Sequence, residues 1–143
     1  MKKLLGGLVG ALALNLIHET YRRFDDKAPR VDLVGEETLR NIIEATGNEA
    51  PTGNRLYAST LVGDVVSNAL YFSLIGFGKK KNLITRGAIF GAAAGVGTVI
   101  FTKDLGLRDA PVNRFTRTKV LTVSWYLIGG LVTAASIKGL NQN

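Results

Sequence analysis

Apolar residues are concentrated in four segments of this chain, and a narrow line of polar or small side chains runs along each segment. At 100° per residue, these polar positions fall within one arc of each helix, while the rest of the circumference is apolar. A soluble bundle shows the opposite proportions, with a narrow apolar stripe and a wide polar face. The pattern therefore predicts four membrane-spanning helices with facing polar arcs, at residues 4–20, 56–77, 86–102 and 119–137.

The length of the segments sets a condition on this interpretation. A hydrocarbon core about 30 Å thick requires roughly 20 residues of helix. The second segment is long enough, whereas the apolar runs of the first and third contain only about 15 residues each. They reach spanning length only if flanking basic and aromatic side chains extend into the interface. An unusually apolar soluble helical domain is the alternative.

The connection at residues 21–55 is predicted to contain a short surface helix. Asp32 stands at an expected N-cap position, and Gly47 is a typical residue to end a helix. The apolar side of this helix could rest on the membrane surface or cover the bundle. That side consists of Leu39, Ile42 and Ile43.

These elements together predict an all-α integral membrane protein. Residues 1–143 are expected to form one membrane domain, a four-transmembrane-helix bundle with a surface helix in the first long loop. The first segment also has features of a signal peptide, but its small-residue pattern at Ala11 and Ala13 comes too early for cleavage. We therefore expect this segment to be a retained helix.

The charge balance indicates a membrane surface, not nucleic acid, as the partner. The chain has 18 Lys and Arg against 11 Asp and Glu, a net charge of +7. The basic residues flank apolar runs, where anionic lipid headgroups are the expected counter-charge. They form no soluble basic face with interleaved aromatics, so nucleic acid is not expected to bind.

The distribution of basic residues leaves the orientation open. In a four-span arrangement, the first and third connections share one side and carry 11 Lys and Arg, while the other side carries 7. The positive-inside rule would place the long connections in the cytoplasm. The dense Lys79–Lys81 cluster favours the opposite orientation.

Residue types also limit the chemistry. The chain has no cysteine, which excludes disulfides, thiolate catalysis and Cys-ligated metals. His18 is the only histidine, which excludes a two-histidine zinc site. No constellation for covalent catalysis is present, so we expect neither enzymatic activity nor a cofactor.

Asp64 is the most prominent candidate for a polar site, because it lies inside an apolar run where an ionised carboxylate costs several kcal/mol. Ser67, Asn68 and Tyr71 share or border its arc. One interpretation is a protonatable or cation-binding residue in a pocket that opens toward the long loops. The other is a structural, hydrogen-bonded acid that fixes the helix register. Candidate partners on neighbouring helices include Asn15, His18 and Trp125.

A second polar group lies at the end of the first helix. His18, Glu19 and Arg22 are within one turn, and Asp25 and Asp26 follow shortly. These acids could form a divalent-cation site, but an ion pair between Glu19 and a neighbouring arginine is the interpretation we favour.

Regularly spaced glycines form the third signal. Small residues four apart let helix backbones approach closely where lipid supplies no hydrophobic drive. Their spacing predicts close packing but does not say whether the neighbour is in the same chain, a second copy or another subunit. The glycines are Gly6, Gly10, Gly87, Gly91, Gly95, Gly129 and Gly130.

Three further segments stand out. They are Ala28-Pro29-Arg30-x-Asp32, Gly63-Asp64-x-x-x-Asn68-Ala69-Leu70-Tyr71 and Trp125-Tyr126-Leu127-Ile128-Gly129-Gly130. Through them the chain resembles a group of small uncharacterised bacterial inner-membrane proteins with four helices, and the likeness covers most of the chain. The group has no established activity, so the resemblance implies an architecture and a location in the bacterial inner membrane.

The functional expectation is a non-enzymatic structural or accessory membrane protein. It would pack through its glycine-rich helix faces into a homo-oligomer or a larger complex with other membrane subunits. The alternative is a small carrier or channel for protons, ions or a solute that uses Asp64. An enzyme acting on lipid would require His18, Glu19 and Asp64 to converge within hydrogen-bonding reach.

Overall fold

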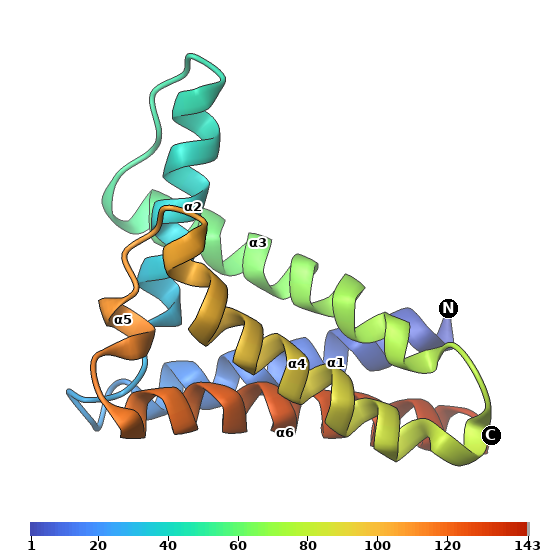
Figure 1. Ribbon diagram of the computed structural model, residues 1–143. Coiled ribbons are helices and arrows are strands. Elements are labelled where there is room, and N and C mark those ends of the chain that lie inside the picture. Colours follow the sequence, from blue (N-terminus) through green and yellow to red (C-terminus); the bar gives the residue numbers. More distant parts are fainter. Residues whose placement is uncertain (143) are drawn as a thin grey trace.

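Four long helices run back and forth along a common axis (Figure 1). The computed structural model describes residues 1–142, of which none is in a β-strand, and the chain is 80% helix. The all-helical prediction is confirmed; Asn143, the last residue of the expected domain, lies outside the described residues. The long helices are α1 (Lys2–Tyr21), α3 (Gly53–Ser73), α4 (Leu83–Asp104) and α6 (Thr116–Leu140).

Shorter elements connect the long helices. Helix α2 (Val31–Ala45) lies between α1 and α3, and α5 (Ala110–Asn113) lies between α4 and α6. Two 3₁₀ turns, Leu74–Gly76 and Lys80–Asn82, shape the connection from α3 to α4.

Each long helix begins two or three residues before its expected start. The apolar pattern marks only the part of a helix that avoids water, whereas backbone hydrogen bonding continues into the flanking polar residues. The extension makes all four helices long and apolar enough to cross a membrane.

The long helices form a row in which α1 packs between α3 and α6, and α6 packs between α1 and α4. Helices α3 and α4 also contact each other. The Tyr71 hydroxyl of α3 donates a hydrogen bond to the Phe90 carbonyl of α4 at 3.0 Å. Both termini and the α3–α4 connection lie at one end, which we call the terminal end (Figure 1). Helices α2 and α5 lie at the other end, the loop end.

Glycines allow the helix backbones on both sides of α6 to approach closely. A side chain at Gly10 of α1 would meet Thr133 and the Gly129 carbonyl of α6. A side chain at Gly130 would meet Gly87 and Gly91 of α4. All seven predicted packing glycines face a neighbouring helix of the same chain, so the neighbour that the sequence left open is intramolecular. The remaining contacts are Gly6 with Ile137 and Gly95 with Val123.

The polar arcs face inward, but most of their hydroxyls are satisfied by their own helix. Thr122 donates to the Thr118 carbonyl at 2.9 Å, and Thr133 donates to the Gly129 carbonyl at 2.9 Å. Both threonines are fully buried. A hydroxyl bonded to the preceding turn needs no partner across the bundle, so these arcs do not form a continuous polar pathway.

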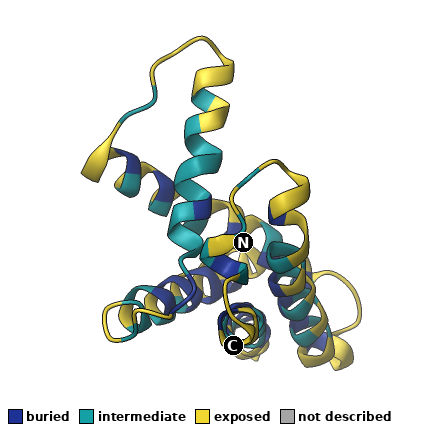
Figure 2. Cartoon of the chain, turned by 60° about the vertical axis from the view of Figure 1, so that its left-hand side comes forward, coloured by how far each residue is buried: buried dark blue, intermediate teal, exposed yellow. Residues whose placement is uncertain are grey.

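Exposed residues follow the outer side of the long helices (Figure 2), and many of them are large and apolar. Large apolar side chains from every long helix are about half exposed there, the arrangement expected where lipid covers the helices. Examples are Leu12, Val62, Leu70, Ile89, Ile100 and Val120.

Helix α2 stands crosswise to the bundle at the loop end (Figure 1). Gly47 follows its last turn with φ of +79°, as expected for a glycine that ends a helix. The predicted capping role of Asp32 is wrong: the N-cap is Arg30, and Asp32 is the second helical residue. Its side chain is held by other partners, described below.

We predict that Gly10→Ala destabilises the protein by about 1–3 kcal/mol, because the added methyl group overpacks the contact with α6. Thermal unfolding in detergent, followed by size-exclusion chromatography, measures the effect. The matched control is Gly63→Ala on α3, where a Cβ atom would meet no atom within 4 Å. Equal melting temperatures for Gly10→Ala and Gly63→Ala would contradict the close-packing role.

Candidate functional site

His18 is at the centre of a group of charged side chains at the loop end. The residue is only 6% exposed, and its ring lies 5.5 Å from the ring of Trp125 on α6. Its Nε2 donates a hydrogen bond to the Pro29 carbonyl at 3.2 Å. The same nitrogen is 3.5 Å from Oδ1 of Asp32. His18 thereby joins α1, α6 and the segment that leads into α2.

Asp32 holds the first turn of α2 against α1. Arg30 contacts both of its carboxylate oxygens, with Nη2 at 2.7 Å from Oδ2, and Nη1 of Arg22 is 3.8 Å from Oδ2. Burial raises the pKa of Asp32, but the hydrogen bonds from His18 and Arg30 outweigh it, and the pKa lies below its usual range. The carboxyl group is therefore ionised at neutral pH.

Arg22 carries the network on to α3. Its guanidinium makes a two-point contact with Glu19, with distances of 2.9 and 2.7 Å, and also donates to the Tyr57 hydroxyl at 3.1 Å. The favoured interpretation, an ion pair at the end of the first helix, describes this contact. We call the five residues His18, Glu19, Arg22, Arg30 and Asp32 the charge cluster.

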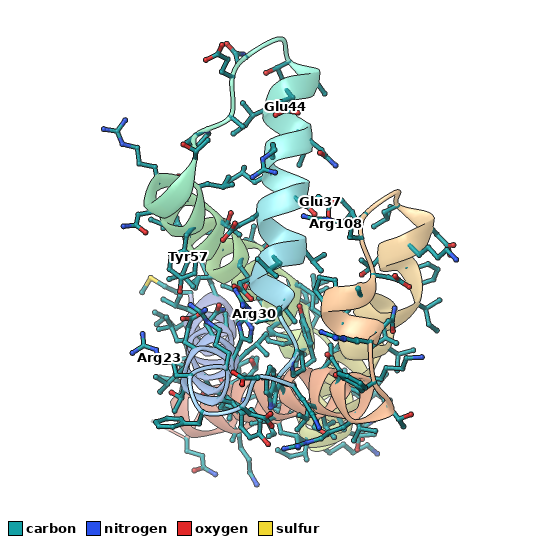
Figure 3. The ribbon with its side chains drawn as sticks, turned by 90° about the vertical axis from the view of Figure 1, so that its left-hand side faces the viewer. Arg23, Arg30, Glu37, Glu44, Tyr57 and Arg108 are labelled. Atoms are coloured by element: carbon teal, nitrogen blue, oxygen red, sulfur yellow. The ribbon has the colours of Figure 1, made fainter. Side chains whose placement is uncertain are left out.

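The charge cluster is balanced, since two carboxylates face two guanidinium groups and His18. Paired in this way, its acids and arginines stabilise one another and hold three chain segments together. A second pair supports α2 from the other side: Glu37 contacts Arg108 at 3.3 Å (Figure 3).

A small, partly open cavity lies beneath the charge cluster, between α1, α2 and α3. Its volume is about 20 Å³, enough for one water molecule. The hydroxyl of Thr60 borders it and is buried without a hydrogen-bond partner among the described residues. A single bridging water would satisfy this hydroxyl. The other polar side chains that line the cavity are Asn15, His18, Glu19, Asp32, Tyr57 and Asp64.

Asp64 lies on the inner side of this cavity. Nδ2 of Asn68 donates to its carboxylate at 3.0 Å, one turn along the same helix. Asp64 also borders a more open groove of about 260 Å³ between α2 and α3, together with Ile42 and Gly63. The carboxylate is therefore hydrogen-bonded, beside a water-sized cavity, and partly accessible from the groove between α2 and α3.

Comparison of the chain with protein-family models, with curated proteins and with solved structures finds no match. The resemblance to bacterial four-helix inner-membrane proteins thus stays a prediction.

The structure brings together most of the predicted site residues, but not all. Asn15, His18 and Asp64 line one cavity, Asn68 bonds Asp64, and Trp125 packs on His18. Two predicted members lie apart. Ser67 is exposed and donates to the Asp64 backbone carbonyl, and Tyr71 bonds the Phe90 carbonyl nearer the middle of the bundle.

The alternative of a divalent-cation site is not supported by the arrangement of the acids. Asp25 pairs with Arg117, and Glu19 pairs with Arg22. Within residues 1–142, no three His, Asp or Glu side chains are placed to hold one metal ion.

Sequence reasoning missed Arg30, Asp32, Tyr57 and Thr60 as members of the site. Asp32 was assigned to helix capping, although an Arg-x-Asp pair directly after Pro29 was visible in the sequence. That pair, near a lone histidine in the preceding helix, is the signal that could have identified the charge cluster. Tyr57 and Thr60 share the polar arc of Asp64, which is a local signal for their position, whereas the cavity beside Thr60 depends on the fold.

We predict that Asp32→Asn destabilises the protein by about 2–3 kcal/mol at pH 7, because it leaves Arg30 and His18 without their carboxylate partner. The lowered pKa of Asp32 means that its contribution is present above the usual carboxyl pKa and is lost as pH falls below it. The difference in melting temperature between wild type and variant should thus be constant from about pH 5 to 7 and shrink below about pH 4.

The matched control is Glu44→Gln, at an exposed position near the far end of α2. It should change the melting temperature by little at any pH. If Asp32→Asn and Glu44→Gln behave alike, Asp32 does not hold α2 in place.

Proposed function

We propose that this protein is a non-enzymatic structural or accessory protein of a membrane, specifically the bacterial cytoplasmic membrane. Four helices of spanning length and an apolar outer surface support the membrane location. The charge cluster would then lie near one interface, with α2 lying along the membrane surface.

The position of α2 is the observation that carries the proposal. The first turn of α2 is fixed to α1 by Asp32, but its second half extends beyond the bundle (Figure 1). Asn41, Ile42 and Glu44 are exposed there. A rigidly anchored helix with an exposed outer half is suited to contact another membrane subunit or a second copy of this chain.

The interior supports a structural role. The acidic and basic groups of the charge cluster are paired with one another, and the cavity beneath them has the volume of one water molecule. Because the glycine-rich faces are used within the chain, assembly would depend on α2.

Transport through Asp64 is the second candidate. The position of Asp64 between the small cavity and the groove between α2 and α3 supports transport. The terminal half of the bundle argues against transport. There Phe72, Ile75 and Ile137 are buried, and glycine contacts close the helix interfaces. A polar route from Asp64 to the terminal end would need these contacts to open.

We predict that the α3–α4 connection and α2 lie on opposite sides of the membrane. Because the chain has no cysteine, Lys80→Cys and Glu44→Cys each introduce a single label site, at the terminal end and on α2. With four spans, these positions lie on opposite sides of the membrane. In intact host cells, a membrane-impermeant maleimide should label only one of the two variants, and both after permeabilisation. Labelling of both in intact cells, or release of the protein by alkaline washing, would contradict the four-span arrangement.

The second prediction concerns partners. Native mass spectrometry of the protein extracted from its own membrane should show a complex of fixed stoichiometry. A photo-crosslinking residue at position 42 should join the partner chain, because Ile42 is exposed on α2. The matched control is position 89, where Ile89 is equally exposed on the lipid-facing side of α4 and should give lipid adducts only.

A monomer without partners in both measurements would count against the accessory function. Proton or cation flux in proteoliposomes that is present for wild type and lost in Asp64→Asn would support transport in its place.

A further inference from the structure

The terminal end of the bundle carries positive charge without any acidic side chain. Seven of the 18 Lys and Arg residues lie there, in the two terminal segments and around the α3–α4 connection. No Asp or Glu occurs in residues 1–18, 65–103 or 110–143. The loop end differs, because Arg22, Arg30, Arg108 and Arg117 are all paired with acids there. The seven basic residues are Lys2, Lys3, Lys79, Lys80, Lys81, Arg86 and Lys138.

Some of these groups surround an open cleft of about 660 Å³, which we call the basic cleft. Lys2, Lys3, Lys80 and Arg86 supply its charged side chains. Asn141 adds a polar side chain, and the apolar side chains of the cleft are those of Met1, Phe77, Leu83 and Ile137. A charged rim and an apolar wall in one cleft match a ligand that has an anionic head and an apolar body.

Arg86 has a fixed orientation in the basic cleft. Its Nε donates to the Ile75 carbonyl at 2.9 Å, and its Nη1 donates to the Lys79 carbonyl at 2.8 Å. Its guanidinium lies against Gly78, whose φ is +100° and where a Cβ atom would come within 3.0 Å of Nη1. The carbonyls carry only partial charge, so the guanidinium keeps a net positive charge, and no acidic side chain of residues 1–142 pairs with it.

The lysines are also positioned by uncharged groups. The ammonium of Lys3 lies 3.6 Å from the centre of the Phe77 ring, and the lysine stem covers Gly76. Lys2 donates to the Leu140 carbonyl at the end of α6. Aromatic and carbonyl contacts hold these side chains near the cleft but leave their charge unbalanced.

We propose that the basic cleft binds the phosphate headgroup of an anionic phospholipid, with Lys3, Lys80 and Arg86 around the phosphate. The inference rests on the membrane location proposed above. A lipid is the favoured source of the phosphate because the cleft lies at the ends of span-length helices and the exposed apolar side chains of Met1 and Phe77 line it. Each basic residue near an anionic membrane surface strengthens the attraction about fivefold, so several in one cleft give selectivity for anionic over zwitterionic lipid.

Lipid retention measured by native mass spectrometry tests this inference. The protein is purified in a mild detergent and supplied with phosphatidylglycerol or with phosphatidylcholine of the same acyl chains. Wild type should retain phosphatidylglycerol preferentially. The double variant Lys3→Gln/Lys80→Gln should lower this retention roughly thirtyfold, because it removes two charges from the cleft. Arg86 is left unchanged, since its hydrogen bonds also hold the α3–α4 connection.

The matched control is Lys103→Gln/Lys119→Gln, which removes two exposed lysines at the loop end. It should retain phosphatidylglycerol like wild type. Equal retention by wild type and Lys3→Gln/Lys80→Gln, or equal losses in both double variants, would overturn the site. Melting temperatures of the variants show whether a loss of lipid accompanies unfolding. If the double variant unfolds, the single variant Lys80→Gln replaces it, and the same results support or overturn the site.

Inorganic phosphate distinguishes the two sources of a phosphate group. Millimolar inorganic phosphate should leave the bound phosphatidylglycerol in place, because it lacks the apolar body that the cleft wall contacts. Displacement of the lipid by phosphate alone would overturn the lipid assignment. Lipid retention is measured on purified protein in detergent. A failure of the lipid inference is therefore distinguishable from a failure of the proposed function, which the topology labelling and the search for partner subunits test.

Discussion

The close approach of α1 and α4 to two sides of α6 is the constraint on which the rest of the structure depends. Gly129 and Gly130 are consecutive, so they point in different directions around α6, one toward Gly10 and the other toward Gly87 and Gly91. Where lipid surrounds a bundle, such backbone contact supplies van der Waals attraction that the hydrophobic effect does not. It fixes the relative positions of three helices, and α3 then packs on α1 with Phe72 against Gly129.

This packing divides the interior into two unlike halves. The terminal half is filled by apolar side chains and glycine contacts, whereas the loop half contains the charge cluster, the water-sized cavity and Asp64. The charge cluster holds together segments that the glycines do not reach. Through Asp32 it orients α2, and through the Tyr57 contact of Arg22 it ties α1 to α3. A buried ionic group of this kind favours one arrangement over others more than it adds stability.

The positions and the packing faces of the long helices could be predicted from the sequence, because apolar periodicity and glycine spacing are local properties. The identity of each glycine's neighbour could not be predicted, since Gly87 and Gly130 are 43 positions apart and only the fold brings them together. The candidate site was partly predictable. Asp64 and His18 were conspicuous as rare polar residues in apolar runs, and the structure places both at one cavity. Asp32 was misassigned because an acid at a helix start usually caps the helix, and only tertiary contact shows that this one pairs with His18 and Arg30.

The placement of α2 and α5 at the same end also gives the molecule unequal cross-sections. At the terminal end, only a tight connection and the chain termini accompany the four helices, whereas the loop end carries a crosswise helix and a further short one (Figure 1). In a bilayer, such a shape would displace more lipid area from one leaflet than from the other. Many copies in one membrane region would therefore exert a bending moment on the membrane. The protein would be most stable where the leaflet around its narrow terminal end is already the concave one.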